Sequence, residues 1–132
     1  MKTFEIQNIY TGLVGIKTKK LPIKLAFVLS RNMKKLEEVV QDVDENRQKL
    51  LNQYGEKDDD GNLVVADDGN VKIMDANNFV AEMSEIMETE VDITLDKVSR
   101  SDIEKCDQDG YDKLTLEEVG AMECMIEEEL ES

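Results

Sequence analysis

The chain has 132 residues, of which 40% are apolar and 36% charged, and its formal net charge is −15 at pH 7. This length predicts a single domain that covers residues 1–132. With three Phe, three Tyr and no Trp, the core must come from aliphatic and Met side chains. Such a composition favours elongated helices, because a helix can bury a narrow apolar stripe and leave its other faces in water.

The composition also excludes several kinds of chemistry. There is no His, which removes Ser–His–Asp and Cys–His nucleophile pairs and His-ligated zinc. The sequence has no Gly-rich phosphate-binding loop, and no apolar run reaches the roughly 18 residues that a membrane span requires. We therefore expect a protein that is not an enzyme, has no cofactor and does not cross a membrane.

The charge is divided between two parts of the chain. Residues 1–35 carry eight basic residues and one acidic residue, whereas residues 36–132 carry eight basic and thirty acidic residues. The net charges of the two parts are +7 and −22. This division predicts a basic end and an acidic body, and hence two different kinds of surface.

The strongest structural signal is a long helix over residues 22–54. No Gly or Pro lies between Pro22 and Gly55, and Pro22 suits the first turn of a helix. Positions spaced alternately by four and three residues form a heptad seam that is apolar except at one basic position. The seam consists of Leu29, Met33, Leu36, Val40, Val43, Arg47, Leu50 and Tyr54.

A helix of this length must pack its apolar stripe against another element, because helix propensity alone does not stabilise it. The leading expectation is that helices from the same chain cover the stripe. These would be a short helix over residues 3–14 and a C-terminal helix. The alternative is a homodimer formed through the long helix as a coiled coil. Phe27 is expected in the core.

The segment after Gly55 carries the signals of a β-hairpin. Two short β-branched runs, residues 63–65 and 71–74, lie on either side of an Asp-Gly turn. We therefore predict a hairpin over about residues 62–74. Alternation of apolar and polar residues over 91–95 predicts one further short strand.

Two more helices are predicted by their N-terminal caps. Asp75 can cap a helix over residues 76–88. Thr115, with Glu118 three residues later, has the pattern of a capping box before a helix over residues 116–130. The predicted fold class is α+β, mainly α, with a long central helix packed by N- and C-terminal helices and one small β-hairpin.

One loop resembles the calcium-binding loop of an EF-hand. Asp107, Asp109 and Asp112, with Glu118 at loop position 12, are the metal candidates. The pattern departs from an EF-hand because Asp112 occupies the position that needs Gly, and Tyr111 stands where a ligand is usual. We therefore interpret this segment as a turn that leads into the helix cap and predict no metal site.

The two charged parts of the chain offer candidate surfaces for a partner. The basic candidates are Lys17, Lys19, Lys20, Lys24 and Arg31. The acidic candidates on the long helix are Glu37, Glu38, Asp42 and Glu45. Nucleic acid is the less favoured partner, because no aromatic residues interleave with the lysines for base stacking. The basic segment could instead hold the acidic C-terminal part of the same chain.

The sequence resembles a family of small acidic phage and prophage proteins of unknown function. The resemblance is carried by residues 20–27 before the long helix, the Tyr-Gly-Glu-Lys-Asp-Asp-Asp-Gly-Asn stretch at 54–62, the Asp-Gly-Asn-Val stretch at 68–71, and the acidic C-terminal helix. It implies a tailed phage of a Gram-positive host, or an integrated copy, and brings no catalytic residues.

Composition and resemblance together predict a non-enzymatic phage accessory protein that binds a host or phage protein in the host cytoplasm. Inhibition or modulation of a host defence or nucleic-acid-processing system is the specific hypothesis, suggested by small size and strong acidity. The alternative is a morphogenesis or virion-associated structural factor that assembles through its long helix.

Overall fold

The computed structural model of the protein describes residues 1–126 and contains, in this range, five α-helices, three short 3₁₀ turns and no β-strand. The α-helices are α1 (Thr3–Leu13), α2 (Ile23–Tyr54), α3 (Ala76–Glu88), α4 (Arg100–Glu104) and α5 (Leu116–Met122). The 3₁₀ turns are η1 (Val14–Thr18), η2 (Lys105–Asp107) and η3 (Glu123–Met125).

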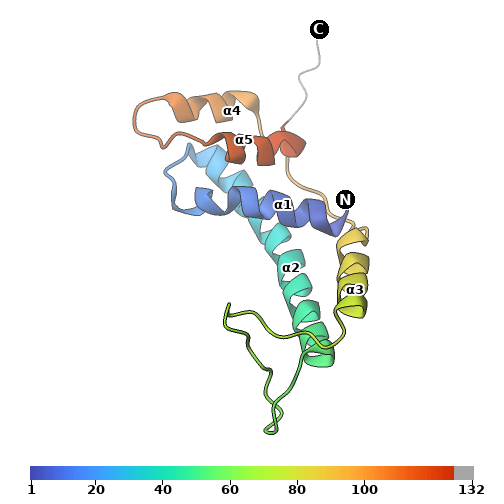
Figure 1. Ribbon diagram of the computed structural model, residues 1–132. Helices are drawn as coiled ribbons and strands as arrows, with labels where there is room; N and C mark the ends of the chain where they lie inside the picture. The colour runs from blue at the N-terminus through green and yellow to red at the C-terminus, as the bar shows by residue number, and fades with distance from the viewer. Residues whose placement is uncertain (127–132) are drawn as a thin grey trace.

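Helix α2 runs along the whole molecule and organises the other elements (Figure 1). Its 32 residues span about 48 Å at 1.5 Å per residue. Helices α1, α4 and α5 gather around its first half, and α3 lies beside its second half. The loops of residues 55–75 extend beyond its C-terminal end. The molecule is therefore a rod with a thick head and a thin tip.

The apolar stripe of α2 is buried mainly in the head. Leu25, Leu29, Met33 and Leu36 are each at most 4% exposed. They join one core cluster with side chains of α1, η3 and the chain before α4. Because the first half of the predicted seam is covered by the same chain, a coiled-coil homodimer through these residues would have to displace that packing. Arg47, the one basic seam position, is exposed.

The contact between α1 and α5 depends on a glycine. An ideal Cβ added at Gly12 would lie 2.8 Å from the Cβ of Ala121 and 3.5 Å from the backbone oxygen of Glu117. Two helices can approach this closely only where one of them has no side chain. This approach seals the core cluster on its α1 side, where Leu13 and Met122 are both fully buried.

A buried amide ties the middle of the core together. Asn32 is fully buried on α2. Its Nδ2 donates to the Asp96 carbonyl oxygen at 3.0 Å, and its Oδ1 accepts from the Asp96 backbone N–H at 2.7 Å. The same Nδ2 lies 3.3 Å from the sulfur of Met125. This pair of bonds anchors the extended chain before α4, which has no sheet to hold it.

The predicted hairpin over residues 62–74 is wrong, and so is the α+β fold class, since the described chain is helical with isolated β-bridges only. The reason is that three short segments share their backbone hydrogen bonds. Val64 N–H donates to the Glu56 oxygen, Lys72 N–H to the Val64 oxygen, and Glu56 N–H to the Lys72 oxygen. Each pair of segments shares two such bonds and a single β-bridge, so no continuous ladder forms.

An eight-residue repeat explains this arrangement. The sequence Asp-Asp-Gly-Asn occurs at residues 59–62 and again at 67–70, and the bonded residues 56, 64 and 72 have the same spacing. Gly61 and Gly69 both adopt positive φ, at 82° and 86°, which favours glycine. The repeat turns the chain back too soon for a strand to develop.

Two other predicted elements differ from the structure. Residues 91–95 run extended but form no strand, because Val91 N–H bonds to the Met1 oxygen and the chain then follows α2. The helix expected over 116–130 ends as an α-helix at Met122 and continues through η3. Its last predicted residues, 127–130, lie outside the described range. Within that range no helix has both the length and the hydropathy needed to span a bilayer.

We predict opposite stability effects for two Gly→Ala substitutions. Gly12→Ala should lower the free energy of unfolding by about 1–3 kcal/mol, because the new methyl group collides with Ala121. Gly120→Ala should raise it by about 0.5–1 kcal/mol, since nothing lies within 4 Å of that position and Ala favours a helix. Urea titration of both variants measures the effects. A Gly12→Ala protein with the same free energy of unfolding as the unsubstituted protein would contradict the close packing of α1 on α5.

We predict that Asn32→Ala lowers the free energy of unfolding by about 2–3 kcal/mol, because both polar backbone groups of Asp96 lose their partner. The matched control on the same helix is Asn46→Ala. Asn46 is exposed and bonds only to the Asp42 oxygen in the described chain, so its replacement should change stability by at most about 0.5 kcal/mol. Equal losses in the two variants would refute the anchoring role of Asn32.

Candidate functional site: the basic end of the rod

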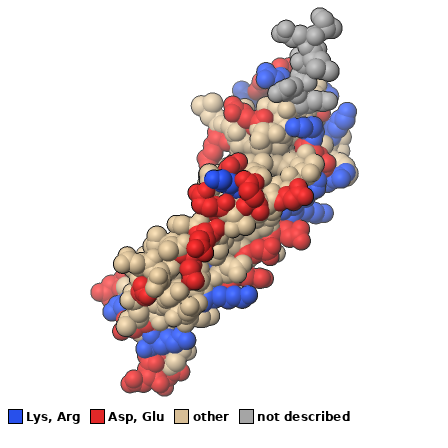
Figure 2. All heavy atoms as spheres, turned by 90° about the vertical axis from the view of Figure 1, so that its right-hand side faces the viewer, with Lys and Arg blue, Asp and Glu red and all other residues tan. Residues whose placement is uncertain are grey.

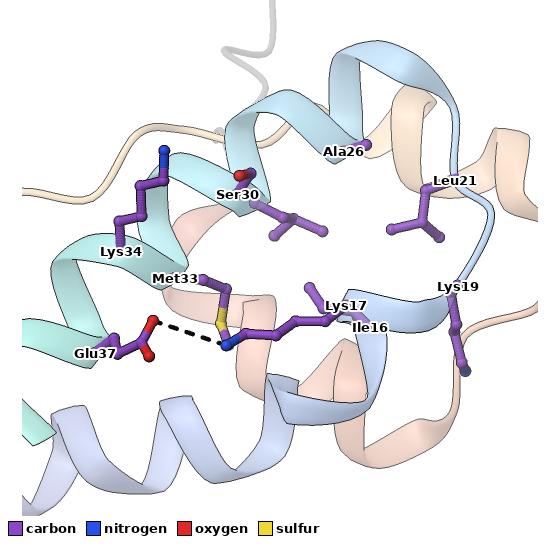
Figure 3. A pocket seen from close by; sticks show the side chains of 10 residues that line it. Ile16, Lys17, Lys19, Leu21, Ala26, Ser30, Met33, Lys34 and Glu37 are labelled. Carbon is purple, nitrogen blue, oxygen red and sulfur yellow. Dashed lines mark ion pairs between the residues drawn. The ribbon is translucent and has the colours of Figure 1, made fainter.

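A pocket of about 390 Å³ opens at the head end of the molecule (Figure 3). It lies between η1, the first turns of α2 and residues 19–22 that join them, called here the connector. Its apolar lining consists of Ile16, Leu21, Ala26, Leu29 and Met33. Its polar lining consists of Lys17, Lys19, Ser30, Lys34 and Glu37. The pocket, called here the end pocket, therefore combines an apolar floor with a mostly basic rim.

The lysines of the rim are held in different ways. Lys17 extends beside Met33 toward Glu37, with its Nζ 3.7 Å from the Glu37 Oε2 (Figure 3). The same ammonium lies 5.6 Å from the ring centre of Tyr10. Lys34 forms no ion pair with any residue of the described chain. The rim therefore keeps at least one cation available to an approaching carboxylate.

Two large apolar side chains are exposed next to the end pocket. Ile23 is 86% exposed and Phe27 is 61% exposed. On a helix with 3.6 residues per turn, Ser30, Ile23, Lys34 and Phe27 fall within about 60° of the circumference. The apolar residues thus continue the pocket's edge around α2. We call Ile23, Lys24, Phe27, Arg31 and Lys34 the basic end surface.

This surface was only partly predicted from the sequence. Lys24 and Arg31 were identified as candidates, but Phe27 was expected in the core, which is wrong. The exposure of Phe27 could have been inferred from its position outside the heptad seam, two residues before Leu29. In the structure the Arg31 guanidinium lies 5.8 Å from the centre of the Phe27 ring, and its Nε lies 3.0 Å from the Asp96 Oδ2. Arg31 therefore helps to fix the exposed ring.

Lys19 serves the fold rather than a partner. Its Nζ donates to the Glu118 Oε1 at 2.5 Å and to the Lys113 carbonyl oxygen at 2.8 Å. Glu118 is 4% exposed and completes the Thr115 capping box predicted from the sequence, with its Oε1 also accepting from the Thr115 N–H. The basic connector therefore holds the acidic C-terminal part of the same chain, as the alternative interpretation of the charge division suggested.

A second contact strengthens the same closure. The Lys20 N–H donates to the Asp112 Oδ2 at 2.7 Å, and the Asp112 N–H donates to the Lys20 oxygen at 2.8 Å. Of the four metal candidates, Asp112 and Glu118 are thus engaged in contacts with the connector, while Asp107 and Asp109 are exposed. Across residues 1–126, no three Cys, Asp or Glu side chains form a group that could hold a metal ion.

The acidic candidates on α2 lie further along the rod. Glu37 lines the end pocket, whereas Glu38, Asp42 and Glu45 are exposed in successive turns of α2. Glu37 pairs with Lys17, whereas Glu38, Asp42 and Glu45 do not join the basic candidates in one site. The structure therefore separates the predicted partner-binding residues into a basic group at the head and an acidic group along the shaft.

Comparison of the chain with protein-family models, with curated proteins and with solved structures gave no match in any of the three. The resemblance to phage proteins therefore stays a prediction from the sequence.

The Lys19–Glu118 pair gives a prediction about pH. Burial alone would raise the pKa of the Glu118 carboxyl, but hydrogen bonds from Lys19 and from the Thr115 backbone outweigh burial and hold this pKa below its usual value. A carboxyl with a lowered pKa stabilises the fold above its unfolded-state pKa of about 4.3, and this stabilisation is lost as the pH falls through the lower folded-state pKa.

We therefore expect Glu118→Gln to lower the free energy of unfolding by about 1–3 kcal/mol at pH 7. The difference from the unsubstituted protein should shrink below about pH 4, since a protonated Glu118 resembles Gln. Denaturant titrations between pH 7 and pH 3 measure this. The control is Glu117→Gln, at an exposed neighbouring position. A difference that stays constant with pH would contradict the charged pair.

Proposed function

We propose that the protein is a non-enzymatic binding protein whose basic end surface, together with the end pocket, receives an acidic and partly apolar segment of another protein. The observation that supports this is the exposure of Ile23 and Phe27 beside an apolar pocket with lysines on its rim. Exposed apolar residues that adjoin an apolar pocket are typical of interaction sites, whereas scattered ones are common on any surface.

The mixture of charge and apolar area favours a protein partner over nucleic acid. Lysines alone could follow a phosphate backbone. A phosphate backbone, however, offers nothing to bury Ile23 or to fill an apolar pocket, and base stacking needs accessible aromatic faces. Phe27 is the aromatic residue of the basic end surface, and Arg31 already lies near its ring. An acidic helix or loop with an apolar side chain matches both features.

The resemblance to phage proteins gives this proposal its biological setting. Under that resemblance the partner is a host or phage protein, the site of action is the host cytoplasm, and the effect is inhibition or modulation of a host defence or nucleic-acid-processing system. A basic surface attracts an acidic partner over distances of about 10 Å at moderate ionic strength, which suits a small protein that must find its target quickly.

A matched pair of charge reversals on α2 tests the proposal. Lys24→Glu reverses a charge on the basic end surface. Lys49→Glu makes the same change at an exposed position of the shaft. Tagged forms of both variants and of the unsubstituted protein should be purified from infected host cells. The proteins retained with them should be identified by mass spectrometry, and the salt concentration that releases each one should be measured.

We expect a stoichiometric partner that the unsubstituted protein and Lys49→Glu retain and that Lys24→Glu retains at least about tenfold less, because one like charge now faces the partner's carboxylates. Phe27→Ala should weaken retention as well. Equal retention by Lys24→Glu and Lys49→Glu would refute the proposal. Retention that disappears after nuclease treatment would instead support nucleic acid.

A further inference from the structure

The basic end surface and the loops at the opposite end of the rod carry opposite charges. Residues 17–35 contain seven basic residues and no acidic residue, whereas residues 55–75, called here the acidic tip, contain seven acidic and two basic residues. None of the seven carboxylates of the acidic tip forms an ion pair with another residue of the described chain. Figure 2 shows acidic side chains at the lower end of the molecule, with basic side chains just above them, and further acidic side chains along the rest of this face.

The acidic tip also exposes apolar side chains. Val65 is 58% exposed and Met74 is 73% exposed. The tip therefore has the two properties, negative charge and accessible apolar area, that we assigned to the partner of the basic end surface.

The loops of the acidic tip are held in fixed shapes. The Asp58 Oδ1 accepts from the N–H groups of Asp60 and Asn62 at 3.0 and 2.9 Å. The Asp68 Oδ1 accepts from the Asn70 N–H at 3.0 Å. Together with the shared backbone bonds of the three segments, these contacts leave little loop freedom to lose when the tip binds a partner.

The two surfaces cannot meet within one molecule. Ile23 begins α2 and the acidic tip follows its last residue, Tyr54, so about 48 Å of continuous helix separates them. A second copy of the chain can bring an acidic tip to a basic end surface. Every copy carries one of each surface, so the two surfaces are present at equal concentrations.

We propose that the acidic tip of one copy docks on the basic end surface of a second copy, with Val65 and Met74 facing Ile23 and Phe27. This inference rests on the proposed function and identifies the protein bound by the basic end surface as a second copy of the chain. Two copies that dock end to end keep one unused tip and one unused basic end, so this heterologous contact generates open chains of copies. The small apolar area at each end makes this a weak contact, sensitive to concentration and salt.

A mixing experiment distinguishes this contact from any contact that pairs two like surfaces. Phe27→Glu places a carboxylate on the basic end surface and leaves the acidic tip intact. The double variant Val65→Lys with Met74→Lys reverses the character of the tip and leaves the basic end intact. Each variant is measured alone and in an equimolar mixture by sedimentation velocity, from about 10 μM to 1 mM protein, a range suited to weak contacts.

The unsubstituted protein should form oligomers whose mass rises with concentration and falls as salt increases. Each variant alone should stay monomeric, with self-association weakened at least about tenfold. The mixture should form a pair of one copy of each variant and nothing larger, because it contains one intact tip and one intact basic end.

Matched controls add the same charges to the shaft, at exposed glutamines of α2. Gln48→Glu corresponds to the basic-end variant, and Gln41→Lys with Gln48→Lys corresponds to the tip variant. Both controls should associate like the unsubstituted protein. A protein that is monomeric at all concentrations overturns the inference, as does a variant mixture that stays monomeric.

These outcomes separate the inference from the proposed function. If the chain stays monomeric while Lys24→Glu, unlike Lys49→Glu, loses a partner, the basic end surface binds a foreign protein and only the self-association is refuted. If association survives Phe27→Glu and is abolished by the tip variant, the tip binds a surface other than the basic end, which overturns the inference and leaves the basic end without an assigned partner.

Discussion

The whole architecture depends on covering the apolar stripe of α2. A helix of 32 residues cannot be held by propensity alone, so residues distant in the sequence must pack on it. In the head this is achieved by α1 and by the chain around α4 and α5, with Gly12 permitting the close contact of α1 with α5. Along its second half α2 is covered less, mainly by the half-buried face of α3, and only Val43 and Leu51 are buried there. Stability is therefore concentrated at one end of the rod.

This unequal distribution of packing also separates the surfaces. The connector before α2 uses Lys19 and the Lys20 backbone to hold the loop and cap of α5, which leaves the outer face of the first turns of α2 uncovered. At the other end, the shared hydrogen bonds of residues 55–75 consume the backbone groups, and five acidic residues of this segment, Asp58, Asp59, Asp60, Asp67 and Asp68, are exposed. The length of α2 then fixes the separation between the basic end surface and the acidic tip.

The helices could be predicted from the sequence more completely than the loops and the exposed surfaces, for physical reasons. The absence of Gly and Pro located α2, and the Thr115–Glu118 pattern located the start of α5, because both signals are local. The hairpin was wrong since β-branched runs around a turn cannot show that the middle segment divides its bonds between two neighbours. Phe27 was misplaced because apolarity was equated with burial, and the role of Asn32 depends on Asp96, 64 residues away. Of the basic end surface, the charged residues Lys24 and Arg31 could be predicted from the sequence, whereas the exposure of Ile23 and Phe27 depends on which face of α2 the head leaves uncovered.

Whether the two ends meet can be measured directly with a spin label. A nitroxide would be attached to Asn62→Cys, at the acidic tip, in a chain whose exposed Cys124 is replaced by Ser; Cys106 is buried. This labelled chain is mixed with a ¹⁵N-labelled copy that carries no nitroxide, and the broadening of amide signals is recorded. The proposed docking of the tip predicts broadening at residues 20–31 of the second copy, on the basic end surface and its connector. Broadening confined to residues 55–75, or no broadening at any concentration, would contradict it.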